Sequence, residues 1–551
     1  MTNVWQAIAG LKAGYLGNQW HWGYWVGLIT IFTLGGIWRF TLPLPPIMDP
    51  DTVSYLNPAI EAVTTGSYSP TFRSFLYPFF LIAVLKVAPQ LEAITFVQHI
   101  LGLVTAVLIV ITLFRSGGFL PKGAFLNWGI RFVAMFVATV FLFSRDTIIL
   151  EHSIRPEGVF PLFCIITILS GVQLMRRLYL RGCCVDWQTA MWAVMLMISS
   201  IGNLYLKPAW GLAAVTSLVP LVLIWRLVPG RALWKSGTLS IGVVVTFCAV
   251  VFPGQLWKRQ YGSNFFLPGT LLAAHAEILY DIFQKDVLRL PSESKKRHYL
   301  LEFMKDIQSA MESPSVSRYG FRINPDDILY GGAIRKLKTQ FPSTQEFSKF
   351  CFYYYLRAWL ACPVAMVAKV CKQMQFFYLP RIKSVYDEGC GFPLERYRQE
   401  SLESVVAFKY PACALIDRYR ASLSESRAPK RIFLLPVLVK YVSRYLNYTF
   451  FPLFILSAVG GIATWHFSLR QLQSAAALVL YFSSFNFFNC LTISTVHMMD
   501  VNRYRFSQIA MSLVSQGFQC LFLFALVSVL ALHCRRVLTS QTTEQLMTGD
   551  S

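Results

Sequence analysis

The sequence predicts an all-α polytopic membrane protein with about ten transmembrane helices and a mainly helical extracytoplasmic segment. Of its 551 residues, 55% are hydrophobic and only 14% are charged, a balance that soluble domains do not reach. Apolar runs of about 18 residues or more recur along the chain, and each is long enough to cross a bilayer as a helix. Helices are expected because lipid offers no partner to unpaired backbone groups.

Ten runs are long enough to span. We expect them at residues 23–42, 92–114, 125–143, 157–175, 187–206, 208–226, 237–255, 446–466, 470–492 and 507–533. The run "FLYPFFLIAVLKVA" at residues 75–88 is too short to cross before Pro89. We therefore expect it to be a re-entrant or interfacial piece.

Basic residues support this topology. With the amino terminus in the cytoplasm, every short inner loop is basic, as the positive-inside rule requires; the residues are Arg115, Lys122, Arg176, Arg177, Arg181, Arg226, Arg231, Lys235, Arg470, Arg535 and Arg536. Counting residues 75–88 as a span would invert all these loops. The pattern predicts an integral multi-pass protein, of a bacterial inner membrane or of the ER membrane if the source is eukaryotic.

Three regions follow from these spans. Residues 1–255 form an N-terminal transmembrane module with a long first loop, residues 256–445 an extracytoplasmic or interfacial segment, and residues 446–551 the last helices with a short cytoplasmic tail. Within the middle segment, residues 352–379 are apolar and aromatic but carry Arg357, Lys369 and Lys372. We expect one helix there, lying along the membrane interface.

The charge and the motifs limit the function classes. The net charge of +22 is explained by basic loops that meet anionic lipid head groups, so membrane lipids are expected partners and nucleic acid is not. There is no GxxxxGK[ST] or HExxH motif, so no cofactor is required, although the acids of the first two loops could bind a divalent cation. The twelve cysteines show no CxxC spacing and are expected to be mostly free, with disulfides open only among Cys351, Cys362, Cys371, Cys390 and Cys413.

Ionisable residues gather on the predicted outer face. They are Asp49, Asp51, Arg73, Arg145, Asp146, Glu151, His152, Arg155, Glu157, Lys207, His275, Glu277, His497, Asp500, Arg503 and Arg505. A charge near hydrocarbon costs roughly 2.5–3.5 kcal/mol on insertion scales, so such residues usually face a cavity and mark function. Several cations around a few carboxylates suit an anionic substrate that also needs a base. A lipid phosphate or pyrophosphate fits, because arginine matches phosphate oxygens.

Simpler structural roles remain open for these residues. Asp49 precedes Pro50 and could cap a helix that Gly66 closes, and Asp51 could be a solvated acid of its first turn. Arg155 and Glu157 could pair with each other. The remaining alternatives are head-group anchors for Arg503 and Arg505 and a packing role for His275.

The first loop resembles the opening of the GT-C membrane glycosyltransferases, a superfamily that includes protein O-mannosyltransferases and lipid A aminoarabinose transferases. Asp51 lies four residues before Tyr55, a helix ends at Gly66, and "FRSFLYPFFLIAVLK" follows, similar to D-x-x-x-Y…G…R/K-x-P-L-Y-P. The second-loop E-x-x-x-R-P-E at residues 151–157, the late Arg503-Tyr504 and Lys207 fit the same group. The likeness covers residues 25–226 and, more loosely, 480–533.

Two positions depart from that pattern. Ser74-Phe75 replaces the usual proline, and Asp49-Pro50-Asp51 replaces an Asp–Glu pair. The catalytic acid is therefore open between Asp49 and Asp51, although the spacing to Tyr55 favours Asp51.

The resemblance implies transfer of a sugar, with inversion, from a polyprenyl-phosphate donor to a glycan, lipid or protein acceptor on the extracytoplasmic face. Asp51 would be the general base. The implied substrate-binding residues are Tyr55, Arg73, Tyr77, Arg155, Glu157, Lys207, His497 and Arg503, of which Arg73, Arg155 and Lys207 would hold the phosphate. Two other classes stay open: a lipid-linked oligosaccharide flippase or secondary transporter, which would need charges or broken helices near mid-membrane, and a non-catalytic assembly protein.

Overall fold

The computed structural model describes residues 2–69, 71, 73–180, 186–221, 242, 245, 266–312, 323, 325–378, 394–407, 410–426, 434–496, 504 and 507–548. Over these residues the backbone is almost entirely helical and contains no β-strand; one isolated bridge pairs Ile47 with Ser153. The first half contains α1 (Thr2–Thr41), α2 (Val53–Thr64), α3 (Leu76–Val87), α4 (Glu92–Gly117), α5 (Ala124–Phe143), α6 (Arg145–His152), η1 (Pro156–Gly158), α7 (Phe160–Leu180), α8 (Trp187–Leu206), η2 (Pro208–Trp210) and α9 (Gly211–Ser217).

The second half is also helical. Its elements are α12 (Phe266–Ala274), α13 (Ala276–Arg289), α14 (Lys295–Glu312), α15 (Pro325–Tyr330), α16 (Ala333–Thr339), α17 (Thr344–Ala361), α18 (Pro363–Tyr378), α19 (Leu394–Ala407), α20 (Ala414–Glu425), α21 (Leu434–His466), α22 (Arg470–Val496) and α24 (Ile509–Thr548).

Seven helices of the described chain are long and apolar enough to cross a membrane: α4, α5, α7, α8, α21, α22 and the part of α24 at Ile509–Leu532. They coincide with seven of the ten expected spans and confirm an all-α polytopic membrane protein. Helix α1 contains the expected span 23–42 but is not among the seven, and α21 begins earlier than expected, at Leu434. The expected span 208–226 begins as η2 and α9; its end, and nearly all of span 237–255, lie outside the described residues.

The spanning helices share one core, in which α4 packs against α5, α7 and α24. Close approach depends on small residues, as is usual between membrane helices. At Gly171 in α7, a Cβ atom would overlap the hydroxyl of Tyr481 in α22. That hydroxyl donates to the Ser217 carbonyl at 3.2 Å, which joins α22 to α9.

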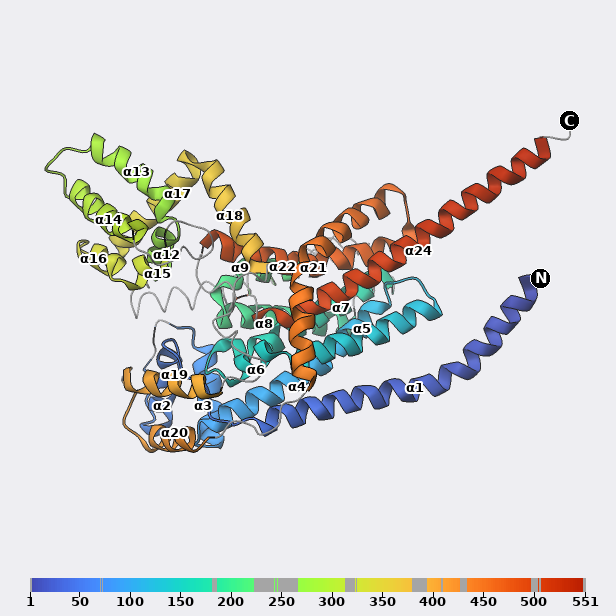
Figure 1. Cartoon of the computed structure of the whole chain (residues 1–551), viewed down its shortest axis with the longest axis horizontal. Coiled ribbons are helices and arrows are strands. Elements are labelled where there is room, and N and C mark those ends of the chain that lie inside the picture. Colours follow the sequence, from blue (N-terminus) through green and yellow to red (C-terminus); the bar gives the residue numbers. More distant parts are fainter. Residues whose placement is uncertain are drawn as a thin grey trace.

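The two ends of this bundle differ (Figure 1). The start of α1 and the end of α24 both extend to the right of the view, apart from each other, whereas α2, α3, α19 and α20 gather at the left. Helix α3 has 12 residues and packs against α2, α4 and α8, so the expectation that residues 75–88 are too short to span is confirmed.

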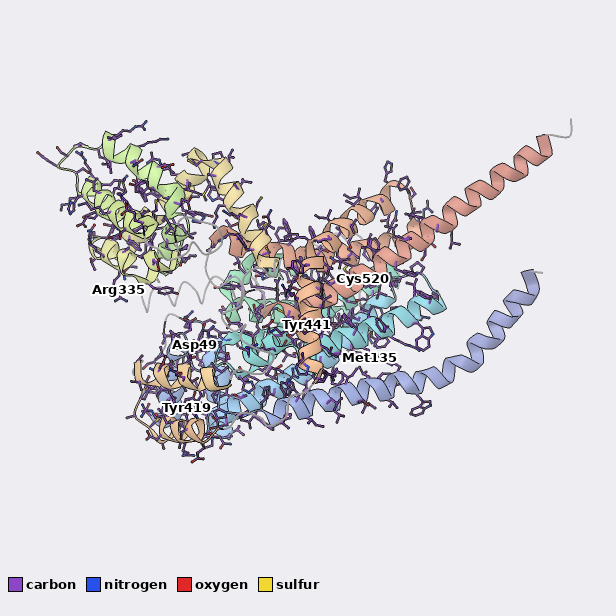
Figure 2. All side chains as sticks on the ribbon, in the orientation of Figure 1. Asp49, Met135, Arg335, Tyr419, Tyr441 and Cys520 are labelled. Atoms are coloured by element: carbon purple, nitrogen blue, oxygen red, sulfur yellow. The ribbon has the colours of Figure 1, made fainter. Side chains whose placement is uncertain are left out.

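The middle segment has two parts. Helices α12 to α17 and the start of α18 enclose a separate hydrophobic core around Phe283, Phe303 and Tyr354, and Figure 2 shows it apart from the end that carries Asp49 and Tyr419. Helices α19 and α20 instead cover the first loop. The Met48 amide donates to Ser401 Oγ at 3.1 Å and Tyr419 Oη donates to the Pro46 carbonyl at 2.7 Å.

The prediction of one continuous helix over residues 352–379 is wrong, and its placement along the membrane interface stays a prediction. Helix α17 ends at Ala361, α18 begins at Pro363, and the two axes are bent by 102°. Proline has no N–H to continue the first helix and is favoured at the start of the second. The described cysteines Cys164, Cys351, Cys362, Cys371, Cys413, Cys490 and Cys520 are free thiols, and Cys390 lies outside the described residues.

Candidate functional site

The first loop begins with a hydrogen-bonded turn that Asp49 organises. Its Oδ1 accepts from the amides of Asp51 at 2.8 Å and Thr52 at 3.2 Å, while Thr52 Oγ1 accepts from the Asp49 amide at 3.0 Å. This reciprocal arrangement satisfies amides that precede α2. Gly66 follows that helix with φ +76°, the left-handed conformation that favours glycine. Asp49 therefore organises the turn that leads into α2, whereas the N-cap residue of α2 is Thr52, which makes no side-chain capping bond.

Asp51 and Arg73 form the more accessible ion pair of the loop. Arg73 Nη2 lies 2.6 Å from Asp51 Oδ1, with the two side chains 25% and 31% exposed. Arg73 Nε donates to Ser54 Oγ at 3.0 Å, and its guanidinium lies 4.9 Å from the centre of the Tyr55 ring. Helix α2 supplies Ser54 and Tyr55, so it orients the arginine. The structure thus brings together the acid, tyrosine and arginine of the first-loop motif.

Asp49 pairs with Arg155 of the second loop. The two loops are also joined by backbone bonds, from the Ile47 amide to the His152 carbonyl at 2.8 Å and from the Ile154 amide to the Ile47 carbonyl at 3.3 Å. Arg155 and Glu157, considered as a pair from the sequence, each have a partner from another segment.

Glu157 faces Lys207 at the end of α8. Lys207 Nζ lies 3.5 Å from Glu157 Oε1, and both side chains are nearly buried. The ammonium also donates to Ser507 Oγ at 2.8 Å and lies 4.4 Å from the centre of the Tyr504 ring. Lys207 therefore joins the second loop to the start of the last transmembrane helix. His497 and Arg503, expected to complete this side, lie outside the described residues.

Tyr77 lies among these pairs. Its hydroxyl donates to Gln98 Oε1 at 3.1 Å, and its ring meets that of Tyr55 edge-on at 5.5 Å. Burial raises the pKa of Tyr77, and the nearby charges of Glu157 and Asp49 raise it further. The structure thus places Tyr77 between the first and second loops, with its hydroxyl bound inside the protein.

Tyr410, between α19 and α20, also reaches the site. Burial raises the pKa of Tyr410 to about 12, and the charge of Asp49 contributes. No motif in the local sequence indicates that Tyr410 belongs to the site. It lies near Asp49 only because α19 and α20 fold back onto the first loop.

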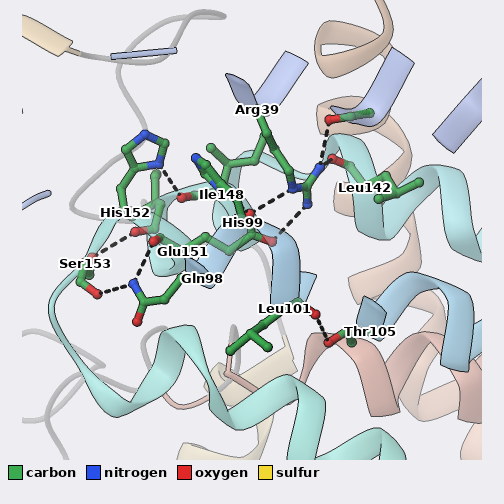
Figure 3. A network of polar contacts seen from close by, with 12 residues as sticks. Arg39, Gln98, His99, Leu101, Thr105, Leu142, Ile148, Glu151, His152 and Ser153 are labelled. Carbon is green, nitrogen blue, oxygen red and sulfur yellow. Dashed lines mark hydrogen bonds and ion pairs between the residues drawn. The ribbon is translucent and has the colours of Figure 1, made fainter. Parts of the chain in front are cut away.

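A buried ionic network supports the second loop (Figure 3). Arg39 at the end of α1 binds Glu151 through two parallel bonds, Nε to Oε2 at 2.8 Å and Nη2 to Oε1 at 2.9 Å. Arg39 Nη1 donates to the Leu142 carbonyl at 2.6 Å, and His99 Nδ1 lies 2.7 Å from Glu151 Oε2. All three side chains are at most 3% exposed. Such bidentate pairs are strong and geometrically specific.

The surroundings of Glu151 explain its charge. Burial alone would raise the pKa of Glu151, but Arg39 and His99 lower it overall. Gly102 makes the space, because a Cβ atom there would overlap the carboxylate. Burial and the charge of His99 lower the pKa of His152 to about 3.

Gln98 connects this network to the site. Its Nε2 donates to the carbonyls of Glu151 at 2.7 Å and Ser153 at 3.1 Å, while its Oε1 accepts from Tyr77. Arg39, Gln98 and His99 are not among the site residues that the sequence predicts. A signal existed for Arg39 and His99, since ionisable residues inside predicted spans are functional or structural by default.

Cations and carboxylates alternate throughout the site. Among the described residues, no three His, Cys, Asp or Glu side chains gather closely enough to hold a metal ion. Each of the three cations, Arg73, Arg155 and Lys207, is paired with a carboxylate.

Comparisons with known proteins add little information about the site. No protein-family model and no curated protein matches the sequence. Among solved structures, ArnT from Cupriavidus metallidurans bound to undecaprenyl phosphate matches over 86% of this chain and 78% of its own, with 11% identity and a TM-score of 0.31. A score this low does not establish a common fold, so the candidate site rests on its own geometry.

Proposed function

We propose that the protein is a membrane glycosyltransferase of the GT-C type. It would move a sugar from a polyprenyl-phosphate donor to a glycan, lipid or protein acceptor on the extracytoplasmic face, with inversion. The observation that carries this proposal is the convergence of three acid–cation pairs, Asp51–Arg73, Asp49–Arg155 and Glu157–Lys207, at one end of the helix bundle.

The cations are suited to a departing lipid phosphate. Negative charge develops on the phosphate as the sugar leaves, and fixed cations in a partly desolvated site stabilise it most. Arg73 presents a planar guanidinium held by Ser54 and Tyr55, which fits phosphate oxygens in a bidentate manner. Lys207 is 8% exposed and contributes a second, compact positive charge to the site.

Asp51 is the proposed base. An attacking hydroxyl must lose a proton, and a carboxylate within hydrogen-bond reach can accept it. Without substrate, Arg73 holds Asp51 in an ion pair. A donor phosphate that takes over Arg73 would release the carboxylate, so donor binding would activate the base.

The alternative base, Asp49, is less suited. Its carboxylate already holds two backbone amides and Arg155, and it is 16% exposed against 31% for Asp51. Removing Asp49 would disturb the loop itself, whereas removing the charge of Asp51 leaves the turn intact.

The test is mass analysis of surface glycans in a deletion strain complemented with wild type, Asp51→Asn or the control Asp281→Asn, an exposed acid of α13. We expect loss of one defined sugar in the deletion and Asp51→Asn strains, and restoration by the control. Full activity of an inserted Asp51→Asn protein would remove Asp51 from the mechanism.

A flippase or secondary transporter is the second candidate. The observation in its favour is the 102° break between α17 and α18, since transporters bind substrates at broken helices. The same deletion strain separates the two, because a flippase defect would accumulate a complete lipid-linked glycan on the cytoplasmic side.

A further inference from the structure

We propose that an open pocket between the ends of α4 and α7 binds the head group of an anionic phospholipid, in the leaflet opposite the candidate site. The inference is independent of the transfer reaction proposed above, because the pocket lies at the other end of these helices and its test is lipid binding.

The pocket brings together two arginines from separate helices. It has a volume of about 310 Å³ and is lined by Ile111, Phe114 and Arg115 of α4 and by Arg176 of α7. Arg115 lies in the last turn of α4 and is exposed. The two helices pack against each other, so their basic ends share one surface.

Helix geometry places this pocket across the membrane from the candidate site. Gln98 of α4 binds the second loop, and a rise of about 1.5 Å per residue puts Arg115 roughly 26 Å further along the helix. Phe160, at the start of α7, lies beside Lys207, and the same rise puts Arg176 roughly 24 Å from it. Both lengths are close to the hydrocarbon thickness of about 30 Å.

The basic loops of the sequence predict that this end of the helices faces the cytoplasm. The cytoplasmic leaflet carries anionic lipids, and basic pockets between transmembrane helices on that side bind their head groups. An anionic phospholipid is therefore the ligand that is available at this depth.

The sequence around the pocket supplies cations without acids. Residues 93–145 and 158–185 contain no aspartate or glutamate. The first acid after α7 is Asp186, which pairs with Arg177 and accepts from the Thr189 amide at 2.9 Å. Arginine stays charged at physiological pH. Its guanidinium has five donors, so each arginine can contact other parts of the protein and still bind a phosphate.

An apolar stripe leads from the arginine along α4. Ile111, Val107, Val104 and Ile100 are exposed, and they follow Arg115 back along the helix at intervals of three or four residues. Side chains at this spacing lie on one helix face. The stripe is long enough to accompany an acyl chain into the bilayer, whereas free phosphate would gain nothing from it. Its continuity with Arg115 is the reason for assigning the pocket to a lipid.

The test uses the purified full chain in uncharged detergent micelles, titrated with phosphatidylglycerol in one arm and with phosphatidylcholine in the other. Arg115→Gln removes one charge of the pocket, and Ile111→Trp fills its apolar wall while keeping both arginines. Lys122→Gln is the matched control, because this exposed lysine lies in the loop between α4 and α5 but does not line the pocket.

We expect saturable binding of phosphatidylglycerol, about ten-fold weaker or more in Arg115→Gln, as loss of a charge-assisted bond implies. Ile111→Trp should also weaken it, and Lys122→Gln should leave it unchanged. Equal binding of phosphatidylcholine, or equal losses in Lys122→Gln and Arg115→Gln, would show a diffuse surface charge and overturn the proposal.

A competition arm separates the lipid from free phosphate. Inorganic phosphate should not displace the lipid at equal concentration, and displacement would overturn the assignment to a lipid. If Arg115→Gln does not fold, Ile111→Trp decides the question, because wild-type affinity in that variant would show that the pocket is not the binding site.

Discussion

Arg155 of the second loop forms an ion pair with Asp49 of the first, and the same carboxylate holds the turn that presents Asp51. The position of the proposed base is therefore coupled to a cation from a distant part of the chain. Both side chains of the pair are largely shielded, at 13% and 16% exposed.

This coupling predicts a measurable interaction energy. In a double-mutant cycle of Arg155→Gln and Asp49→Asn, we expect about 1–2 kcal/mol of coupling in the free energy of unfolding in mixed micelles, since contacting charges are not additive. The exposed pair Arg420–Asp417, 3.9 Å apart and 51% and 71% exposed, is the control and should show almost none. Equal coupling in the two pairs would contradict a buried link between the loops.

Replacement of Arg73 by lysine should impair donor recognition. Lysine keeps the charge but loses the planar fork that meets Asp51, Ser54 and the Tyr55 ring. We expect the KM for the lipid-linked donor to rise about ten-fold, with an unchanged circular dichroism spectrum. Arg335→Lys on α16, outside the site (Figure 2), serves as control. An unaltered KM would show that Arg73 does not contact the donor.

Glu151→Gln should destabilise the whole protein. Removing one partner of a buried pair leaves uncompensated charge, here Arg39, at a cost of about 3–5 kcal/mol. We expect a lower melting temperature and a lower yield of inserted protein. Gly102→Ala should act similarly, because the added methyl would overlap the same carboxylate. The exposed Glu293→Gln should behave as wild type, and a Glu151→Gln protein as stable as this control would refute the role of the network.

Acid should destabilise the protein in two stages. The folded pKa of His152 is lowered to about 3, so the unfolded chain takes up this proton first and stability falls below about pH 6.5, by roughly 1.4 kcal/mol per pH unit. The folded pKa of Glu151 is also lowered, so its stabilising charge, present above its unfolded pKa, is lost at still lower pH. Melting temperatures from pH 7.5 to 4 should show this decline, and His152→Gln should flatten its upper part. Constant stability from pH 7 to 5 would argue against a neutral buried His152.

The elements that the sequence predicts well are those with a local signal. Uninterrupted apolar length identifies the seven spans, and the short run before Pro89 is correctly excluded. The spacing of Asp51, Tyr55 and Arg73 likewise marks side chains that meet around one helix start. Whether these residues catalyse transfer stays a prediction.

Contacts between distant segments carry no such signal. Arg39 and Glu151 are 112 residues apart, and either could have paired with another charge until the helices packed. For the same reason Arg155 binds Asp49 of the first loop, although Glu157 is closer to it in the sequence. The bend between α17 and α18 did have a local sign, Pro363, which the apolar composition of residues 352–379 outweighed.

The contacts of α19 and α20 with the first loop have a consequence for biosynthesis. Met48 and Ser401, like Pro46 and Tyr419, are separated by 353 and 373 residues respectively. At about 5–20 residues per second, a ribosome needs roughly 20–70 s to travel that far. The first loop therefore lacks these contacts until most of the chain has been synthesised, and a prematurely terminated chain would never form them.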